Sequence, residues 1–194
     1  MRLRESGMPE EAYWETLFDV GLILDRLGID SRLRNVIEMG CGYGTFTIPV
    51  ARRVSGVLTT FDIDEAMIER TRQRAAAAGA WNVLYMVGDV FADGFGGEAG
   101  SKDACLLFNI LHCEEPLRLL AEAARVVRPG GEVLVIHWRC DPATPRGAEH
   151  GGPAEAGEDS RLGTADLSAR TGQPGAGPPA LALWNPTPAP EGFE

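Results

Sequence analysis

Basic residues are scarce in this chain of 194 residues. Its 18 lysines and arginines face 28 aspartates and glutamates, which gives a formal net charge of −10 and a pI of about 4.8. An acidic surface repels phosphate backbones, so the composition argues against a nucleic-acid partner. The densest basic run, Arg70, Arg72 and Arg74, alternates with Glu69 and Gln73 and fits a solvated helix face.

Cysteines and long apolar runs are also scarce. The four cysteines, Cys41, Cys105, Cys113 and Cys140, show no C-x-x-C spacing, so we expect neither a bound metal nor a disulfide framework. The first residues lack the apolar core of a secretion signal, and no run is long enough to span a bilayer. These absences predict a soluble, cytoplasmic protein without a membrane partner, and they leave its oligomeric state open.

A glycine-rich stretch, residues 36–45, organises the chain. It joins a short apolar run, with Glu38 near its end, to three glycines at alternate positions, Gly40, Gly42 and Gly44. The residues that follow predict a helix, so the pattern is strand, tight turn, helix. Glycine reaches positive φ cheaply and has no Cβ, so a ligand can approach this backbone closely. A purely structural turn is the alternative.

Glu38 and the three glycines resemble the first motif of class I S-adenosylmethionine-dependent methyltransferases, an acidic residue, one spacer and G-x-G-x-G. Residues 36–138 are similar to that family in the order and spacing of their motifs. The nicotinamide-type fingerprint fits less well, because Thr45 occupies its third small position. The resemblance implies that Glu38 fixes the amino group of S-adenosylmethionine, and that the backbone around Cys41 carries its methionine part.

Asp62 ends a second β-rich run, residues 56–62. The carboxyl ends of parallel strands open on one crevice, so Asp62 and the adjoining Ile63 are expected beside the glycine loop. The resemblance implies that Asp62 accepts hydrogen bonds from the ribose hydroxyls of the cofactor. The alternative is that Asp62 or Asp64 caps the next helix, and Asp64 suits that role.

Asp89 follows a third apolar run, residues 82–87. The resemblance implies that its carboxylate accepts from the adenine amino group, while the backbone of Val90 reaches the adenine ring. An ordinary turn aspartate is the alternative.

Asn109 ends a fourth run, residues 102–108, whose nearly continuous apolar character predicts a strand buried on both faces. In the resembled family this position orients the methyl acceptor, and we place Asn109 among the cofactor contacts as well. No Pro-Pro-Tyr follows it, so the signature of adenine and cytosine amino-methylating enzymes is absent. His112 is a candidate base, with a structural histidine as the alternative. Asn109 and His112 are therefore the candidate catalytic residues.

The segment before the first strand carries apolar residues at helical spacing from 9 to 27, ended by Gly28. Helices at this place commonly cap the cofactor pocket in the resembled family. Residues 1–34 are therefore expected to form a helical cap, with Tyr13 and Trp14 as lid or substrate contacts. Core packing of the two aromatic side chains is the alternative.

Beyond the fourth strand the sequence predicts a helix from Pro116 to Arg128, an Arg-Pro-Gly-Gly stop and a fifth strand over residues 132–138. This succession resembles a late pattern of the family. After about residue 141 the pattern stops, because residues 146–194 are rich in Gly, Ala and Pro and cannot bury enough apolar surface to fold. We expect a methyltransferase domain over residues 35–140 and a disordered tail over residues 141–194. The tail is either natural or the product of a reading-frame shift near Arg146 in a GC-rich gene.

Together these patterns predict a doubly wound α/β fold with five parallel strands in order 3-2-1-4-5, helices on both faces and the family's final strands missing. The resemblance implies methyl transfer from S-adenosylmethionine, with S-adenosylhomocysteine as product, and the acidic composition favours a small-molecule acceptor. Two alternatives are a chain that binds S-adenosylmethionine without turnover, because its acceptor pocket is incomplete, and an NAD-dependent oxidoreductase.

Overall fold

The structure is a computed structural model that describes residues 8–113, 115–137 and 180–184. Its centre is a six-stranded sheet in the order β3-β2-β1-β4-β5-β6, and every neighbouring pair of strands is parallel. The strands are β1 Asn35–Met39, β2 Val57–Asp62, β3 Val83–Val87, β4 Lys102–Phe108, β5 Val127–Ile136 and β6 Ala180–Trp184.

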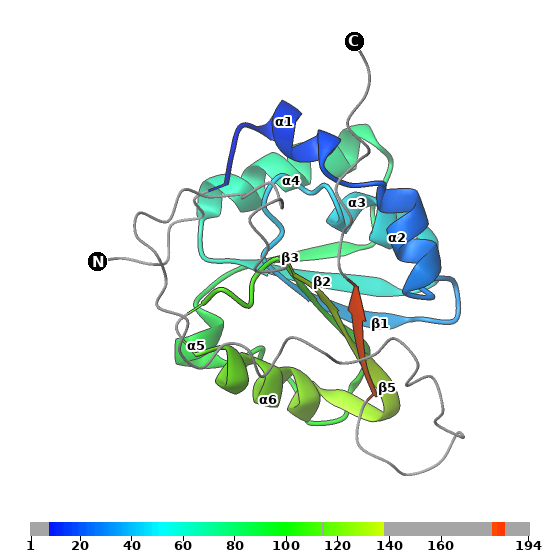
Figure 1. The fold of residues 1–194 in the computed structure, drawn as a ribbon, viewed down its shortest axis with the longest axis vertical. Coiled ribbons are helices and arrows are strands. Elements are labelled where there is room, and N and C mark those ends of the chain that lie inside the picture. The colour runs from blue at the N-terminus through cyan, green and yellow to red at the C-terminus, as the bar shows by residue number, and fades with distance from the viewer. Residues whose placement is uncertain (1–7, 114, 138–179, 185–194) are drawn as a thin grey trace.

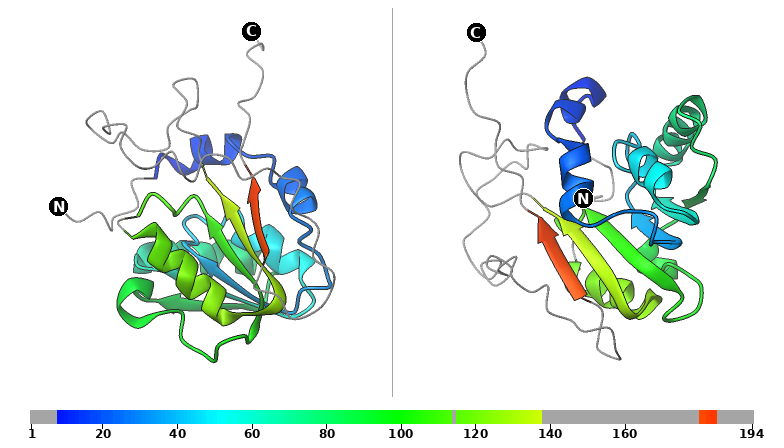
Figure 2. Two further views of the ribbon diagram at one scale, coloured as in Figure 1. Left: turned by 60° about the horizontal axis from the view of Figure 1, so that its bottom comes forward. Right: turned by 90° about the vertical axis from the view of Figure 1, so that its right-hand side faces the viewer.

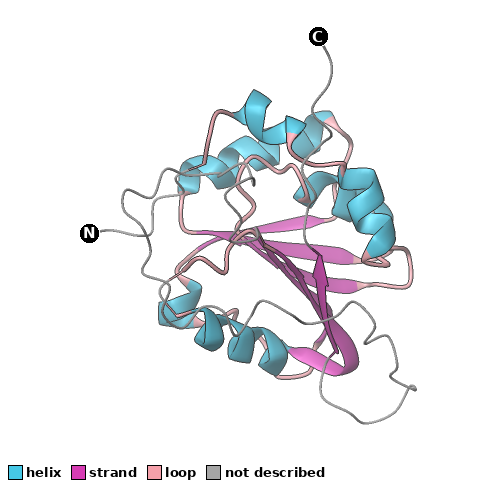
Figure 3. Ribbon diagram, viewed as in Figure 1, coloured by secondary structure: helices cyan, strands magenta, loops and turns pink. Residues whose placement is uncertain are grey.

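Helices cover both faces of this sheet (Figures 1 and 3). One layer holds α1 to α4, and the other holds α5 and α6. None of the described helices is both long and apolar enough to cross a membrane. The helices are α1 Glu11–Thr16, α2 Val20–Arg26, α3 Thr47–Arg53, α4 Glu65–Ala77, α5 Val90–Asp93 and α6 Pro116–Val126.

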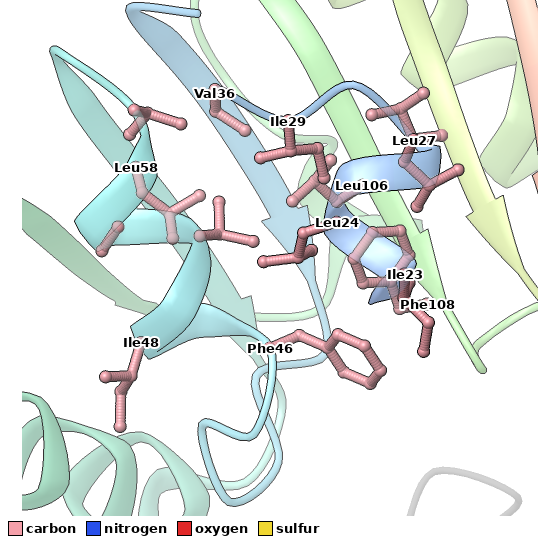
Figure 4. Close-up of a cluster of buried hydrophobic side chains, with 14 of the residues drawn as sticks. Ile23, Leu24, Leu27, Ile29, Val36, Phe46, Ile48, Leu58, Leu106 and Phe108 are labelled. Atoms are coloured by element: carbon pink, nitrogen blue, oxygen red, sulfur yellow. The ribbon is translucent and has the colours of Figure 1, made fainter. Parts of the chain in front are cut away.

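The two helical layers enclose two apolar cores, and the central strands supply side chains to both. Successive residues of a strand point to opposite faces, so Val36 of β1 packs toward α2 and α3, whereas Ile37 packs toward α6. On the first side, Ile23 and Leu24 of α2 lie against Leu106 of β4 (Figure 4). Burial on both faces explains why the sequences of the central strands are almost continuously apolar.

The predicted strand order 3-2-1-4-5 is confirmed, and a sixth strand extends it. β6 pairs in parallel with Glu132–Ile136 of β5 and lies beside it in both views of Figure 2. The expectation that no strand follows the fifth is therefore wrong at β6, which covers the edge of β5. Pairing along an existing edge satisfies backbone groups whatever the composition around the strand, so composition gave no signal for it. The rest of the predicted disordered tail lies outside the described residues.

Two element boundaries also differ from the sequence prediction. The single helix expected over residues 9–27 is two helices, because Asp19 ends the first segment and caps α2, its carboxylate accepting from the Leu22 N–H at 2.9 Å. β5 begins at Val127, which pairs with Lys102, and pairing resumes only at Glu132 opposite Ala104. The Arg-Pro-Gly-Gly segment is thus an irregularity within the strand.

Candidate functional site

The glycine loop leaves β1 at the carboxyl edge of the sheet and adopts the backbone that its composition predicts. Gly40, Gly42 and Gly44 have φ of +80°, +50° and +80°, a region that residues with a Cβ rarely adopt. A Cβ on Gly44 would also lie 3.0 Å from the Thr71 methyl group, and one on Gly42 would lie 2.8 Å from Sδ of Met8. Conformation therefore favours glycine at all three positions, and space adds to this at Gly44, where Thr71 lies against the backbone.

Asp62, at the end of β2, supports this loop. Its Oδ2 accepts from the Gly42 N–H at 3.0 Å, and its Oδ1 accepts from the Asp64 N–H at 3.0 Å. Burial raises the pKa of the Asp62 carboxyl, and these two backbone hydrogen bonds oppose the rise. Burial also raises the pKa of the Cys41 thiol, which donates to Asp62 Oδ2 at 3.7 Å. Asp64, as predicted, caps α4 by accepting from the Ala66 N–H at 2.8 Å.

Glu38 lies beneath the loop, on the face of β1 that meets α3. Its side chain is 1% exposed, and its Oε2 accepts from the hydroxyls of Thr47 and Thr60, each at 2.7 Å. Thr60 reaches it because the parallel register of β1 and β2 places the two residues side by side. Burial raises the pKa of Glu38 to about 7, although the two hydroxyl hydrogen bonds oppose the shift. Glu38 thus ties the end of β1 to β2 and to the start of α3.

α4 holds the outer side of the glycine loop. The Thr71 hydroxyl donates to the Gly42 carbonyl at 2.8 Å, and the Arg74 guanidinium donates to the Tyr43 carbonyl at 2.8 Å. Because Arg74 is also paired with Glu11 at 2.9 Å, the same side chain links the loop to α1.

The N-terminal segment lies over the loop and is fastened to α4. Tyr43 of the loop donates its hydroxyl to the Pro9 carbonyl at 3.1 Å. Glu11 of α1 accepts two hydrogen bonds from Arg70, each 3.0 Å long, and Glu15 pairs with Arg74. These contacts place α1 and residues 8–10 next to the glycine loop.

Trp14 and Tyr13, the two aromatic residues predicted as lid contacts, lie in different environments. Trp14 is buried and packs edge-on against Phe18 in the core, so core packing, the alternative for this residue, is confirmed. Tyr13 is 48% exposed and keeps an open position on α1.

Asp89 follows β3 and caps the short helix α5, its Oδ1 accepting from the Phe91 N–H at 2.9 Å. The sequence did not predict this capping role for Asp89, and the next residue, Val90, is buried. Ile63, beside Asp62, is 38% exposed and offers an apolar surface at the same edge.

Asn109, at the end of β4, has an unusual conformation. Its φ of +55° is the only positive φ of a non-glycine residue in the described chain, and its N–H donates to the Ile136 carbonyl at 2.7 Å. Both polar atoms of its side-chain amide are buried without a hydrogen-bond partner. Strained backbone and unsatisfied buried amides each cost free energy, and such features concentrate at ligand sites.

Two histidines lie near Asn109 along the chain and across the sheet. The rings of His112 and His137 stack nearly parallel, with centroids 6.4 Å apart. The sequence predicted His112 as a candidate base but gave no signal for His137, which comes near it only because β4 and β5 end side by side. The sequence also gave no signal for Thr47, Thr60 and Thr71, because their partners Glu38 and Gly42 lie on other elements of the fold.

The carboxyl edge of β1, β2 and β4 thus collects the glycine loop, Asp62 and Asn109, and Ile110 lies 3.6 Å from the position of a Cβ on Gly40. Glu38 supports this edge from below. Among the described residues, no group of three or more His, Cys, Asp or Glu side chains is placed to hold a metal ion.

Comparison with known proteins agrees with this arrangement. A family model described as a methyltransferase domain matches residues 36–131, about half of the chain. The chain is 32% identical over 146 residues to an uncharacterized 37.1 kDa protein in transposon TN4556 of Streptomyces fradiae, covering 69% of this chain and 41% of that protein. It is 37% identical over 101 residues to the ribosomal protein L11 methyltransferase of Dechloromonas aromatica, covering 52% of this chain and 31% of that protein. The chain therefore spans less than half the length of these relatives.

A solved structure shares the fold. A SAM-dependent methyltransferase from Aquifex aeolicus superposes with a TM-score of 0.62 at 21% identity, over 72% of this chain and 73% of that one. The parallel sheet, the glycine loop after β1, the carboxylate at the end of β2 and the matched family model agree with one another. The chain belongs to the class I S-adenosylmethionine-dependent methyltransferases.

Proposed function

We propose that this chain binds S-adenosylmethionine at the carboxyl edge of β1, β2 and β3 and transfers its methyl group to an acceptor held near Asn109. The observation that carries the proposal is the meeting of a left-handed glycine loop, a buried carboxylate and an unsatisfied amide at one edge. Parallel α/β sheets bind ligands at this edge.

The residues at this edge fit the cofactor's chemistry. The glycine loop, which has no Cβ atoms at three positions, binds the methionine part. Asp62 accepts hydrogen bonds from the ribose hydroxyls. Asp62 Oδ1 accepts one backbone N–H, and Oδ2 accepts one backbone N–H and the weaker contact of the Cys41 thiol at 3.7 Å. A carboxylate has about four lone-pair sites, so one ribose hydroxyl has a free site and the second replaces the thiol. Two hydroxyls can therefore bind without breaking the two backbone hydrogen bonds of Asp62. Asp89 and the Val90 backbone take the adenine, and Ile63 covers it.

Glu38 has two roles in this proposal. Its side chain is held by Thr47 and Thr60 under the loop, where it ties the end of β1 to β2 and α3. It also binds the cofactor's amino group, directly or through water, so its substitution should weaken cofactor binding.

S-adenosylmethionine, when bound, supplies a methyl group that its sulfonium makes reactive. The chain's own contribution is to hold the acceptor in line with that methyl group and to exclude water. Positioning of this kind is worth about 7–11 kcal/mol of a barrier. The Asn109 amide can donate and accept hydrogen bonds, and its fixed backbone aims it without further ordering. His112, which is exposed, is the nearest candidate base.

We propose a small molecule as the acceptor, supported by the formal net charge of −10, which disfavours an RNA backbone. Two relatives suggest other acceptors to test. One is a ribosomal protein methyltransferase, and another is the 23S rRNA (uracil(1939)-C(5))-methyltransferase of Alcanivorax borkumensis. RNA and ribosomal protein therefore belong in the acceptor panel beside small molecules.

We also propose that α1 and the residues before it form a cap over the bound cofactor. The support is the contact of Tyr43 with Pro9 and the ion pairs of Glu11 and Glu15 with α4.

Calorimetry on the full chain tests the cofactor site, with S-adenosylmethionine, S-adenosylhomocysteine and NAD as ligands. We expect binding of the first two and weaker binding of NAD. Asp62→Ala should weaken S-adenosylmethionine binding by about 10- to 150-fold, since hydrogen bonds to a charged group are worth about 1.5–3 kcal/mol. The matched control is Asp30→Ala, which changes an aspartate just before the amino end of β1. This variant should bind S-adenosylmethionine as the wild type does.

Tighter binding of NAD than of S-adenosylmethionine would refute the proposal in favour of an oxidoreductase. Transfer of a labelled methyl group is then measured over the acceptor panel. Cofactor binding without transfer to any acceptor would mean that the chain binds S-adenosylmethionine without turnover.

A further inference from the structure

The outer edge of β3 lacks the features that protect sheet edges. Its sequence, Val-Leu-Tyr-Met-Val, contains no charged residue and no proline. Leu84, Met86 and Val87 are 57%, 46% and 52% exposed, so no described segment of the chain covers them. Proteins that remain monomeric protect such edges with charges, prolines, bulges or a covering segment. β6 occupies the opposite edge of the sheet (Figure 1).

The backbone of β3 has one row of hydrogen-bonding groups directed away from the sheet. The Asn82 carbonyl accepts from β2, and the Gly88 N–H donates to it, so the even-numbered residues of this segment face β2. The groups of Val83, Tyr85 and Val87 then point outward, because the hydrogen-bonding side alternates along a strand. No strand within the described residues pairs with this row.

A prominent side chain and a groove lie at opposite ends of the same edge. Trp81, just before β3, is 78% exposed, the largest exposure among the bulky apolar side chains of the described chain. Beyond the other end of β3, a groove of about 420 Å³ is lined by Ile68, Arg72 and Val87 with Glu65, Ala66 and Glu69. The distance along the strand between the two features equals the length of β3.

We propose that β3 pairs in antiparallel fashion with β3 of a second copy of this chain, so that each Trp81 enters the groove of the other copy. With the two-fold axis at Leu84, Val83 faces Tyr85 of the second copy and Trp81 faces Val87 of the second copy. Val83, Tyr85 and Val87 belong to the outward-directed row, so their pairing forms regular antiparallel hydrogen bonds, and Trp81 extends the pairing beyond the start of β3. The two Leu84 side chains meet across the axis.

The chemistry of the groove suits an indole. Ala66 and Val87, which are exposed, offer apolar contact, and Glu65 and Glu69 offer acceptors for the indole N–H. The Arg72 guanidinium, which lies 5.1 Å from the centroid of the Tyr85 ring, can also bind an aromatic face. Tryptophans in pockets dominate the energy of many protein interfaces.

The self-complementarity of the edge favours a second copy over an unrelated partner. A two-fold interface uses the same patch on both subunits, so each contact is made twice. Here the exposed Trp81 side chain, the groove and the outer edge of β3 lie on one patch. A single antiparallel register of β3 brings each of them to its counterpart on the second copy. α4 lies beside β3 over the sheet, so the two copies of α4 also become neighbours, and the exposed alanines Ala76, Ala77 and Ala78 at its end leave room for a close approach.

Sedimentation equilibrium of the full chain tests the proposal. We expect a dimer whose dissociation constant rises at least tenfold in Leu84→Lys, which places a charge at the axis, and in Trp81→Ala, which removes the knob. The matched control is Leu117→Lys, which makes the same change at a leucine 70% exposed on α6 and should leave the dissociation constant unchanged. Circular dichroism checks that each variant folds.

Hydrogen exchange provides a second readout. In the dimer the amides of Val83, Tyr85 and Val87 should exchange slowly, and they should lose this protection on dilution or in Leu84→Lys, whereas the amides of Leu84 and Met86 stay protected by β2. A wild-type chain that is monomeric at its highest soluble concentration would overturn the proposal. A dimer that Leu84→Lys leaves intact would also overturn it, because the subunits would then meet at another surface.

Discussion

The buried carboxyl of Glu38 predicts a pH dependence of stability that can be worked out from the structure. The side chain is 1% exposed, and burial raises its pKa from 4.5 to about 7. Between these two values the folded protein keeps a proton that the unfolded chain has already released. The free energy of unfolding therefore falls as the pH rises through this window, and it becomes independent of this group above pH 7.

The magnitude follows from the size of the shift. One pKa unit corresponds to about 1.4 kcal/mol, so a rise from 4.5 to about 7 amounts to a loss of about 3 kcal/mol between the two pH values. This is a large part of the stability of a typical domain, which is about 5–15 kcal/mol.

Glu38→Gln isolates this contribution. Glutamine has nearly the same shape, its amide oxygen can accept from Thr47 and Thr60, and it does not ionise. Urea unfolding is followed by circular dichroism at a series of pH values from 4.5 to 8 for both proteins. We expect the variant to gain about 3 kcal/mol relative to the wild type across this range. Asp62, whose pKa is also raised by burial, is present in both proteins, and its repulsion of the Glu38 charge is part of the measured difference.

The matched control is Glu65→Gln, at an exposed glutamate of α4, whose unfolding curve should follow that of the wild type at every pH. If the stabilities of Glu38→Gln and wild type run parallel from pH 4.5 to 8, the buried carboxyl does not titrate as the structure requires, and the reasoning fails.

Three further predictions concern the loop, the cap and the acceptor edge. Gly44→Ala should cost about 1–3 kcal/mol of stability in urea unfolding, because alanine must adopt a φ of +80° against Thr71; an unchanged midpoint would show that the loop tolerates a Cβ. Glu11→Gln should weaken the attachment of α1 by about 0.5–1 kcal/mol, since its ion pair with Arg70 is partly exposed. Hydrogen exchange in α1 should then be faster in the variant, and 0.5 M salt should produce the same effect in the wild type. Equal exchange rates in the two proteins would contradict this prediction. Asn109→Gly keeps the left-handed backbone but removes the unsatisfied amide, so we expect equal or greater stability and at least about tenfold slower methyl transfer; an unchanged rate would remove Asn109 from the acceptor site.

Local patterns in the sequence predicted most of the elements that build the site. The apolar runs before Glu38, Asp62 and Asn109 indicated strands, and parallel pairing brought their ends to one edge, as the pattern implied. The positive φ of the three loop glycines and the capping by Asp64 were also foreseeable, because each depends on a residue's own backbone preference and its immediate neighbours.

The contacts around each site residue were harder to predict from the sequence. The sequence placed Glu38 next to a ligand, but its hydroxyl partners stand 9 and 22 residues away along the chain. The attachment of α1 to α4 spans 59 residues, and the stacking of His112 on His137 depends on two strands ending at the same level. Such contacts follow from strand register and helix placement, which local patterns do not specify.

The sequence by itself thus determined the order of strands and helices, the glycine loop and the family, because hydrophobic period and turn chemistry act over a few residues. Only the tertiary structure decided that Glu38 is buried beneath the loop, that α1 lies over it, that Asn109 keeps an unsatisfied amide and that a sixth strand completes the sheet. These features arise from pairing between distant segments, where the free energy gained depends on which surfaces meet and on how completely they exclude water.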